Sequence, residues 1–260
     1  MATIDALGYF ANEPERLLCA LHELRSTLSA PDGASGVGVA HFMDDRLLLN
    51  LRPSAVVGGT PMEEMVGTPK TSSLVVSLHT DGDGGPYKFR SWAFCLHGGA
   101  GLESRRADLT QGMPDFLKRN MAGESVGEMA FHRLLTTLHE KGRMDDPNLE
   151  PRAVADALRD TLERLRPSEA GRLSMVMTNG RVLAGVHKGG GMAYNLREGI
   201  LACQRCQLDR TMDPFPLRES HRRYRGVMLA DGLSQTPPGF LDVPAGKVVV
   251  VTRKLDVQLL

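Results

Sequence analysis

Residues 173–187 read Leu-Ser-Met-Val-Met-Thr-Asn-Gly-Arg-Val-Leu-Ala-Gly-Val-His, which is two apolar runs around an Asn-Gly dipeptide. Asn and Gly both tolerate a positive φ, as the tight turn of a β-hairpin requires. The stretch therefore predicts two antiparallel strands, at 173–178 and 181–187. Met175 and Met177 are two residues apart on the first strand and share a face, so we expect both to pack in the core.

Helical patterns precede this hairpin. Residues 151–165 begin with Pro151 and place apolar side chains on one side, as expected of an amphipathic helix. Residues 125–141 repeat the pattern and end at Gly142, a typical residue beyond a helix C-terminus. A shorter helix is predicted at 112–121.

The N-terminal part combines one helix with several strands. Leucines at helical spacing predict a helix over 13–29. Strands are predicted at 37–42, 47–51, 73–79 and 91–96, and after the hairpin at 226–230 and 248–251. This order favours an α+β fold with sheets and outer helices over an alternating parallel fold. We expect one domain spanning residues 1–260, since no linker of adequate length divides the chain.

The composition excludes several classes of partner and location. Lys plus Arg and Asp plus Glu balance at 31 each, so no net charge favours nucleic acid or an acidic membrane. No apolar run approaches the roughly 18 residues that a membrane helix needs, and the first 22 residues do not resemble a secretory signal. The four scattered cysteines fit reduced thiols, and together these features predict a cytoplasmic protein without a membrane partner.

Short motifs along the chain resemble those of a known family. They are LGYFANEP (7–14), DGASGVG (32–38), LRP (51–53), WAFCLHG (92–98), GESVGE (123–128), VMLAD (227–231) and VPAG (243–246). In this order they resemble the class II glutamine amidotransferase domain of the N-terminal-nucleophile hydrolases, especially its stand-alone members. The resemblance covers about residues 1–254 and implies a four-layer αββα sandwich.

The resemblance also implies a chemistry that this chain lacks at its start. Members of the family attack the glutamine amide with an N-terminal cysteine whose own amine, with an ordinary pKa of about 8, accepts the thiol proton. The matching position, four residues before Gly8, is Ile4, and removal of the initiator methionine would expose Ala2. Thr3 is a nearby hydroxyl, but a further cut would be needed to make it terminal. We therefore expect no working nucleophile here.

The other family positions differ as well. The arginine that binds the substrate carboxylate falls at or beside Thr80, and the aspartate that binds its ammonium falls at Val126, which accepts no hydrogen bond. At the oxyanion position the family's His-Asn becomes Leu96 and His97, followed by a retained Gly98. A donor such as His97 can contribute about 3 kcal/mol to an oxyanion, yet only where a nucleophile creates one. We expect His97 to be a packing or solvent-facing residue.

A Cys-x-x-Cys pair lies outside the family pattern. Cys203 and Cys206 precede His221 in an arginine-rich stretch, but a structural zinc site needs a fourth ligand, and no second pair follows. A redox pair is the alternative, although no thioredoxin-like context surrounds it. We expect plain thiols, with neither metal nor cofactor, and a solvated arginine face rather than a nucleic-acid surface.

These observations predict a catalytically inactive glutamine amidotransferase-like protein that binds a protein partner or itself. One alternative is an amidohydrolase or amidotransferase with a rearranged site that uses Thr3 or Cys95. Cys95 is predicted on a buried strand, where thiols are normally inert. Another alternative is a sensor that binds a small amide or amino acid in the vacated cleft.

Overall fold

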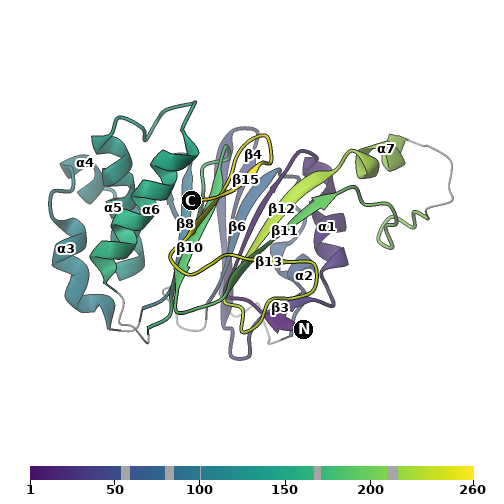
Figure 1. Cartoon of the computed structure of the whole chain (residues 1–260), viewed down its shortest axis with the longest axis horizontal. Helices are drawn as coiled ribbons and strands as arrows, with labels where there is room; N and C mark the ends of the chain where they lie inside the picture. The colour runs from purple at the N-terminus through teal and green to yellow at the C-terminus, as the bar shows by residue number, and fades with distance from the viewer. Residues whose placement is uncertain (54–58, 80–84, 100, 167–170, 210–215) are drawn as a thin grey trace.

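A computed structural model describes the chain except residues 54–58, 80–84, 100, 167–170 and 210–215. Two β-sheets face each other, and helices lie on their outer sides (Figure 1). The predicted α+β class is confirmed. Within the described residues, no helix is long and apolar enough to cross a bilayer.

The larger sheet has seven strands and contains the first long strand of the chain. Its order is β13-β11-β12-β2-β6-β4-β5, and every neighbouring pair is antiparallel. The bounds are β2 Ala6–Ala11, β4 Gly36–Met43, β5 Arg46–Pro53, β6 Ser73–His79, β11 Met192–Glu198, β12 Arg225–Asp231 and β13 Leu241–Asp242.

The smaller sheet has six strands in the order β15-β14-β10-β9-β8-β7. Their bounds are β7 Tyr87–Phe89, β8 Trp92–Gly98, β9 Leu173–Thr178, β10 Leu183–Lys188, β14 Val248–Val251 and β15 Val257–Leu259. Strands β9 and β10 form the predicted hairpin. The second strand begins at Leu183 rather than at residue 181, because Asn179 Oδ1 accepts the backbone N–H groups of Arg181 and Val182, each at 3.0 Å.

Two long helices cover the outer face of the six-stranded sheet. They are α5 (Val126–Glu140) and α6 (Pro151–Leu165), close to the bounds predicted from sequence. Phe131 of α5 stacks on Phe94 of β8 with ring centroids 5.5 Å apart. Met175 and Met177 point into this same apolar layer, as their spacing predicts. Shorter elements lead into α5: η2 Leu102–Arg105, α3 Arg106–Thr110 and α4 Asp115–Lys118.

The seven-stranded sheet carries shorter helices on its outer face. They are η1 (Pro14–Arg16), α1 (Leu17–Glu23) and α2 (Met62–Val66), while α7 (Pro216–Arg222) precedes β12. The helix predicted to reach residue 29 ends at Glu23. The chain then forms β3 (Leu28–Ser29), which pairs in parallel with β1 (Ala2–Thr3). Pairing with the N-terminus overrides the helical leucine spacing here, and Leu28 remains fully buried.

The space between the sheets is filled mainly by apolar side chains. Gly8 allows a close approach there, because a Cβ at that position would lie 2.6 Å from Leu183 Cδ1. The buried set includes Ala6, Phe10, Val75, Cys95, Val176, Leu183, Met192, Val227, Leu229 and Val249. Polar side chains occur where this layer ends, and one end holds the candidate site.

Candidate functional site

Two side-chain hydrogen bonds cross between the sheets at one end of the sandwich. The Ser174 hydroxyl on β9 donates to the Asp231 carboxylate on β12, and Ser77 Oγ on β6 lies 2.9 Å from His97 Nε2 on β8. Backbone pairing explains this convergence. His97 is paired with Ser174, while Ala6 is paired with both Ser77 and Asp231, so the four side chains lie at one level.

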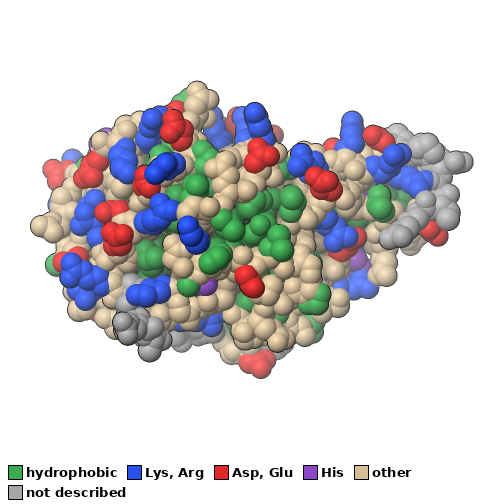
Figure 2. Space-filling model, in the orientation of Figure 1, with side chains coloured by type: hydrophobic (Ala, Val, Ile, Leu, Met, Phe, Trp, Pro, Cys, Tyr) green, Lys and Arg blue, Asp and Glu red, His purple; other side chains and the backbone are tan. Residues whose placement is uncertain are grey.

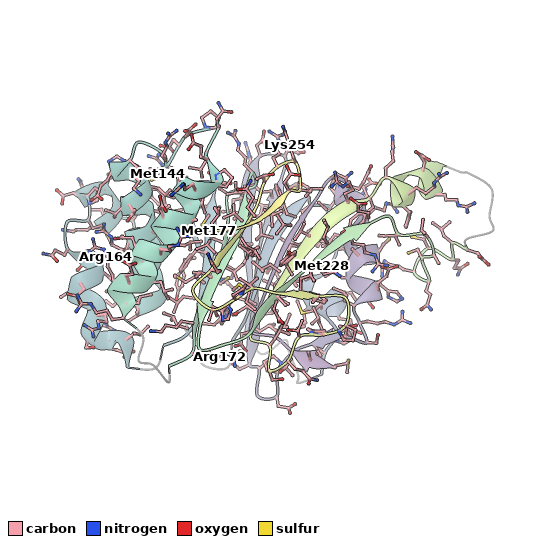
Figure 3. The ribbon with its side chains drawn as sticks, viewed as in Figure 1. Met144, Arg164, Arg172, Met177, Met228 and Lys254 are labelled. Carbon is pink, nitrogen blue, oxygen red and sulfur yellow. The ribbon has the colours of Figure 1, made fainter. Side chains whose placement is uncertain are left out.

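We call these four residues, together with Asp5 and Arg172, the end cluster. Arg172 Nη2 donates to Asp5 Oδ2 at 2.8 Å, and the Asp5 backbone N–H donates to the Asp231 carbonyl at 2.8 Å. Figure 3 labels Arg172 at this end of the sandwich, with Met144 and Lys254 at the opposite end. The end cluster thus brings two carboxyl groups, one guanidinium, one imidazole and two hydroxyls together.

Asp231 is the most unusual titratable group in the end cluster. Its side chain is buried, and burial raises its pKa to about 7, with the neighbouring Asp5 charge acting in the same direction. Its Oδ1 atom has no hydrogen-bond partner among the described residues. A carboxyl with such a pKa can exchange a proton near neutral pH, as acid–base chemistry requires.

The residues predicted at the nucleophile position do not place a nucleophile beside Asp231. Ile4 is fully buried in the core between the seven-stranded sheet and α1, which separates it from the layer between the sheets. Thr3 is exposed, and its backbone is paired with Ser29. Thr80 lies outside the described residues.

Cys95 lies in the layer between the sheets but is closed to solvent. It is fully buried, and burial raises the pKa of its thiol well above the ordinary value. A thiol that stays protonated is a poor nucleophile. Its place in this layer is therefore that of a small apolar side chain.

The retained Gly98 has a backbone reason for being glycine. Its φ is +78°, and a Cβ at this position would lie 2.0 Å from the Arg172 carbonyl oxygen. That oxygen also accepts the Gly99 N–H at 2.8 Å. Only a residue without a side chain fits here, because the end of β8 approaches the backbone of Arg172, just before β9, too closely for a Cβ.

Val126 is the first residue of α5 and packs against the apolar layer of the helices. The turn before it is closed by other residues. Ser125 Oγ accepts the Glu128 N–H at 3.1 Å, and the Glu128 carboxylate accepts the N–H groups of Ala122 and Gly123 at 2.6 and 2.8 Å. The polar groups of this turn therefore bind one another.

Ser77 and Asp231 were not expected as site residues. The only sequence signal was a polar residue inside an otherwise apolar strand, at Ser77 in Leu74-Val75-Val76-Ser77-Leu78 and at the end of β12 for Asp231. That signal indicates which face of the strand a side chain lies on, but not which side chain it contacts. The contact depends on which residues of the two sheets face each other.

The cysteine pair has neighbours that the sequence did not indicate. Cys203, Cys206 and His221 lie together with Cys19 of α1, and all four potential ligand atoms lie within 4.8 Å of one another. Cys19 is therefore a potential fourth ligand that the sequence spacing did not indicate. Cys19 is 187 residues from Cys206, and its setting among leucines resembles a helix core.

A cavity of about 640 Å³ opens at the end of the sandwich away from the end cluster. Its walls include Asn12, Lys70, Asp145 and Arg181, and the β9–β10 turn lies at its rim. The residues that line this cavity include none of the end cluster.

Comparison with known proteins identifies the fold. No family model matches the chain, and no curated protein matches it in sequence. Among solved structures, a glutamine aminotransferase class-II domain protein from Silicibacter pomeroyi aligns over 98% of this chain and 97% of its own, with a TM-score of 0.58 and 15% identity. A predicted glutamine amidotransferase from Pseudomonas aeruginosa aligns over 99% and 95%, with a TM-score of 0.52 and 14% identity.

A larger protein shows the same similarity over part of its length. Glutamine phosphoribosylpyrophosphate amidotransferase from Bacillus subtilis aligns over 98% of this chain but only 48% of its own, with a TM-score of 0.51 and 12% identity. At such identities the comparisons establish similarity of fold. The chain has the mixed α+β fold of the class II glutamine amidotransferase structures.

Proposed function

We propose that this chain is a four-layer amidotransferase-like sandwich that binds a partner protein and does not hydrolyse glutamine. The observation that carries this proposal is the state of Ile4. The position matched to the nucleophile is a fully buried aliphatic side chain in the outer core. A residue in that layer cannot reach a carbonyl carbon at the end of the sheets.

The other residues at family positions support the same proposal. His97 of the end cluster is hydrogen-bonded to Ser77, and Val126 at the start of α5 offers no acceptor for an ammonium group. Ser77 and His97 have the spacing of a nucleophile and its base, but Ser77 is fully buried, so a substrate carbonyl has no path to its hydroxyl. We assign this pair to joining the sheets.

An apolar surface supports binding as the role. Figure 2 shows apolar side chains gathered in the middle of the visible face, where Figure 1 draws β11, β13 and β15. Strands β13 and β15 are edge strands of their sheets. The exposed apolar residues of these strands are Leu196, Leu241 and Leu259, which we call the edge patch. Contiguous exposed apolar side chains are typical of protein–protein interfaces, and a strand edge offers backbone groups to a partner.

The catalytic half of the proposal is tested on the full chain. We expect no ammonia release from glutamine, and no covalent adduct in the intact mass after treatment with an electrophilic glutamine analogue. Ammonia release that is abolished by Thr3→Ala, Cys95→Ala or Ser77→Ala would establish the rearranged enzyme instead. A rise in melting temperature with a small amide or amino acid would favour the sensor, because ligand binding stabilises the native state.

The binding half is tested with variants of the edge patch. If the chain binds itself, Leu241→Glu and Leu259→Glu should abolish the self-association that the wild type shows in sedimentation. If it binds another protein, both variants should fail to capture the protein that cross-links to the wild type in extracts of the source cell. Leu51→Glu is the matched control, since Leu51 is equally exposed on β5 at the far edge of the seven-stranded sheet. Association that is absent, or that is lost equally in the control, contradicts a role for the edge patch.

A further inference from the structure

Three separate segments bring thiols and an imidazole together on the outer side of the seven-stranded sheet. Cys19 comes from α1, Cys203 and Cys206 from the turn after β11, and His221 from α7. All four ligand atoms lie within 4.8 Å of one another, and the Sγ atoms of Cys19 and Cys206 are 3.5 Å apart. Ligands about 2.3 Å from a tetrahedral zinc ion lie roughly 3.5 to 4 Å from each other, so the four atoms already have nearly the required spacing.

Three of these four residues are buried, and the fourth is partly buried. Cys19, Cys203 and His221 are each at most 3% exposed, and Cys206 is partly exposed at the rim. All three cysteines are free thiols. A site with four protein ligands and no open position is typical of structural rather than catalytic zinc.

Backbone hydrogen bonds hold the turn that carries Cys203 and Cys206, whose sulfur atoms lie close together. Cys203 and Leu208 exchange backbone hydrogen bonds of 3.0 and 2.9 Å, and the Gln207 N–H donates to the Gln204 carbonyl at 3.2 Å. Gln207 adopts a φ of +54°, which closes the turn directly after Cys206.

The chemistry of the set selects a soft divalent cation. Zinc binds thiolate and neutral imidazole, and it displaces the thiol protons to solvent when it binds. Three sulfurs and one nitrogen in tetrahedral spacing form one of the common structural zinc sets.

We propose that Cys19, Cys203, Cys206 and His221 bind one structural Zn²⁺ ion. The ion joins α7 and the 199–208 segment to α1, and these elements lie at the outer end of the seven-stranded sheet (Figure 1). The site uses none of the residues of the end cluster or of the edge patch. The zinc site can therefore be tested independently of the proposed function.

The test is the metal content of the full chain purified without chelator. We expect one zinc ion per chain in the wild type and in Cys95→Ser, the matched control whose thiol lies between the sheets. Cys19→Ser, Cys206→Ser and His221→Ala should lose the ion, whereas His221→Cys, which offers four thiolates, should retain it.

A second measurement covers the event that a variant does not fold. The wild type with cobalt in place of zinc should show the thiolate charge-transfer and visible bands of a tetrahedral cobalt site. Removal of the metal should speed proteolysis within residues 199–209 and 216–222. A wild-type chain that neither contains nor takes up stoichiometric zinc overturns the proposal. So does a purified chain with a Cys19–Cys206 disulfide, or zinc retained equally in the serine variants.

Discussion

Ser174 and Asp231 join the two sheets, because the hydroxyl on β9 donates directly to the buried carboxylate at the end of β12. The two residues are 57 positions apart in sequence and both are at most 2% exposed. Asp231 is an ionisable group inside the sandwich, where burial raises the free energy of its charged form. Protonation of Asp231 is therefore linked to stability.

We predict that the unfolding free energy falls as pH rises from about 4 to about 7, by on the order of 3 kcal/mol through Asp231. The folded-state pKa of Asp231, about 7, lies above its ordinary value of 3.8, so the native state binds the proton more tightly and the stability gained from it is lost through this interval. Asp231→Asn, which keeps an acceptor for Ser174, should flatten the profile. Urea unfolding across this pH range measures it.

The control for this profile is Asp256→Asn, which changes an exposed carboxylate. Asp5 and Arg172 are the charged groups facing Asp231, and both remain in the variant. Parallel profiles of the wild type and Asp231→Asn would contradict the assignment.

Ser77→Ala and Ser73→Ala each remove a hydrogen bond between the sheets, at opposite ends of β6. Ser77 Oγ lies 2.9 Å from His97 Nε2, and Ser73 Oγ lies 2.8 Å from Thr178 Oγ1. If both bonds are structural, each variant loses about 1 kcal/mol of unfolding free energy. Exposed Ser104→Ala should change it little. A Ser77 effect on any hydrolysis without an effect on stability would point to catalysis instead.

Gly98→Ala should be strongly destabilising, by about 3 kcal/mol or more, because it combines an unfavourable backbone angle with a steric clash. The added Cβ would lie 2.0 Å from the Arg172 carbonyl oxygen. Gly112→Ala is the matched control: its φ is +69°, but a Cβ there meets nothing within 4 Å. That variant should cost about 1 kcal/mol from backbone strain alone. Similar melting temperatures for the two variants would show that the turn can shift.

Glu128→Ala should destabilise the chain by about 2 kcal/mol, because two partly buried charge-assisted hydrogen bonds from the backbone N–H groups of Ala122 and Gly123 are lost. Glu124→Ala, four residues earlier, changes an exposed side chain 3.6 Å from Arg106 and should cost less than about 0.5 kcal/mol. Thermal unfolding of the pair compares them. Equal losses would mean that the turn before α5 contributes little.

Much of the secondary structure followed from local patterns. The bounds of α6, β6, β9 and β14 match those predicted, because helical spacing, strand composition and flanking proline or glycine act over only a few residues. Strand β11 and helix α7 were missed, since the polar residues around them obscure any apolar pattern. The segment after Glu23 was wrongly assigned to a helix, because its pairing with residues 2–3 is not a local property.

The sequence by itself determined the identities that matter for chemistry: an aliphatic Ile4 and Val126, a retained Gly98 and a neutral charge balance. Only the tertiary structure decided which polar groups meet. It joined Ser77 to His97, Ser174 to Asp231, and Cys19 to Cys206, which is 187 residues away in the chain. The reason is physical: short-range periodicity specifies which face of an element is buried, whereas a ligand set or a hydrogen bond between sheets depends on how distant elements pack.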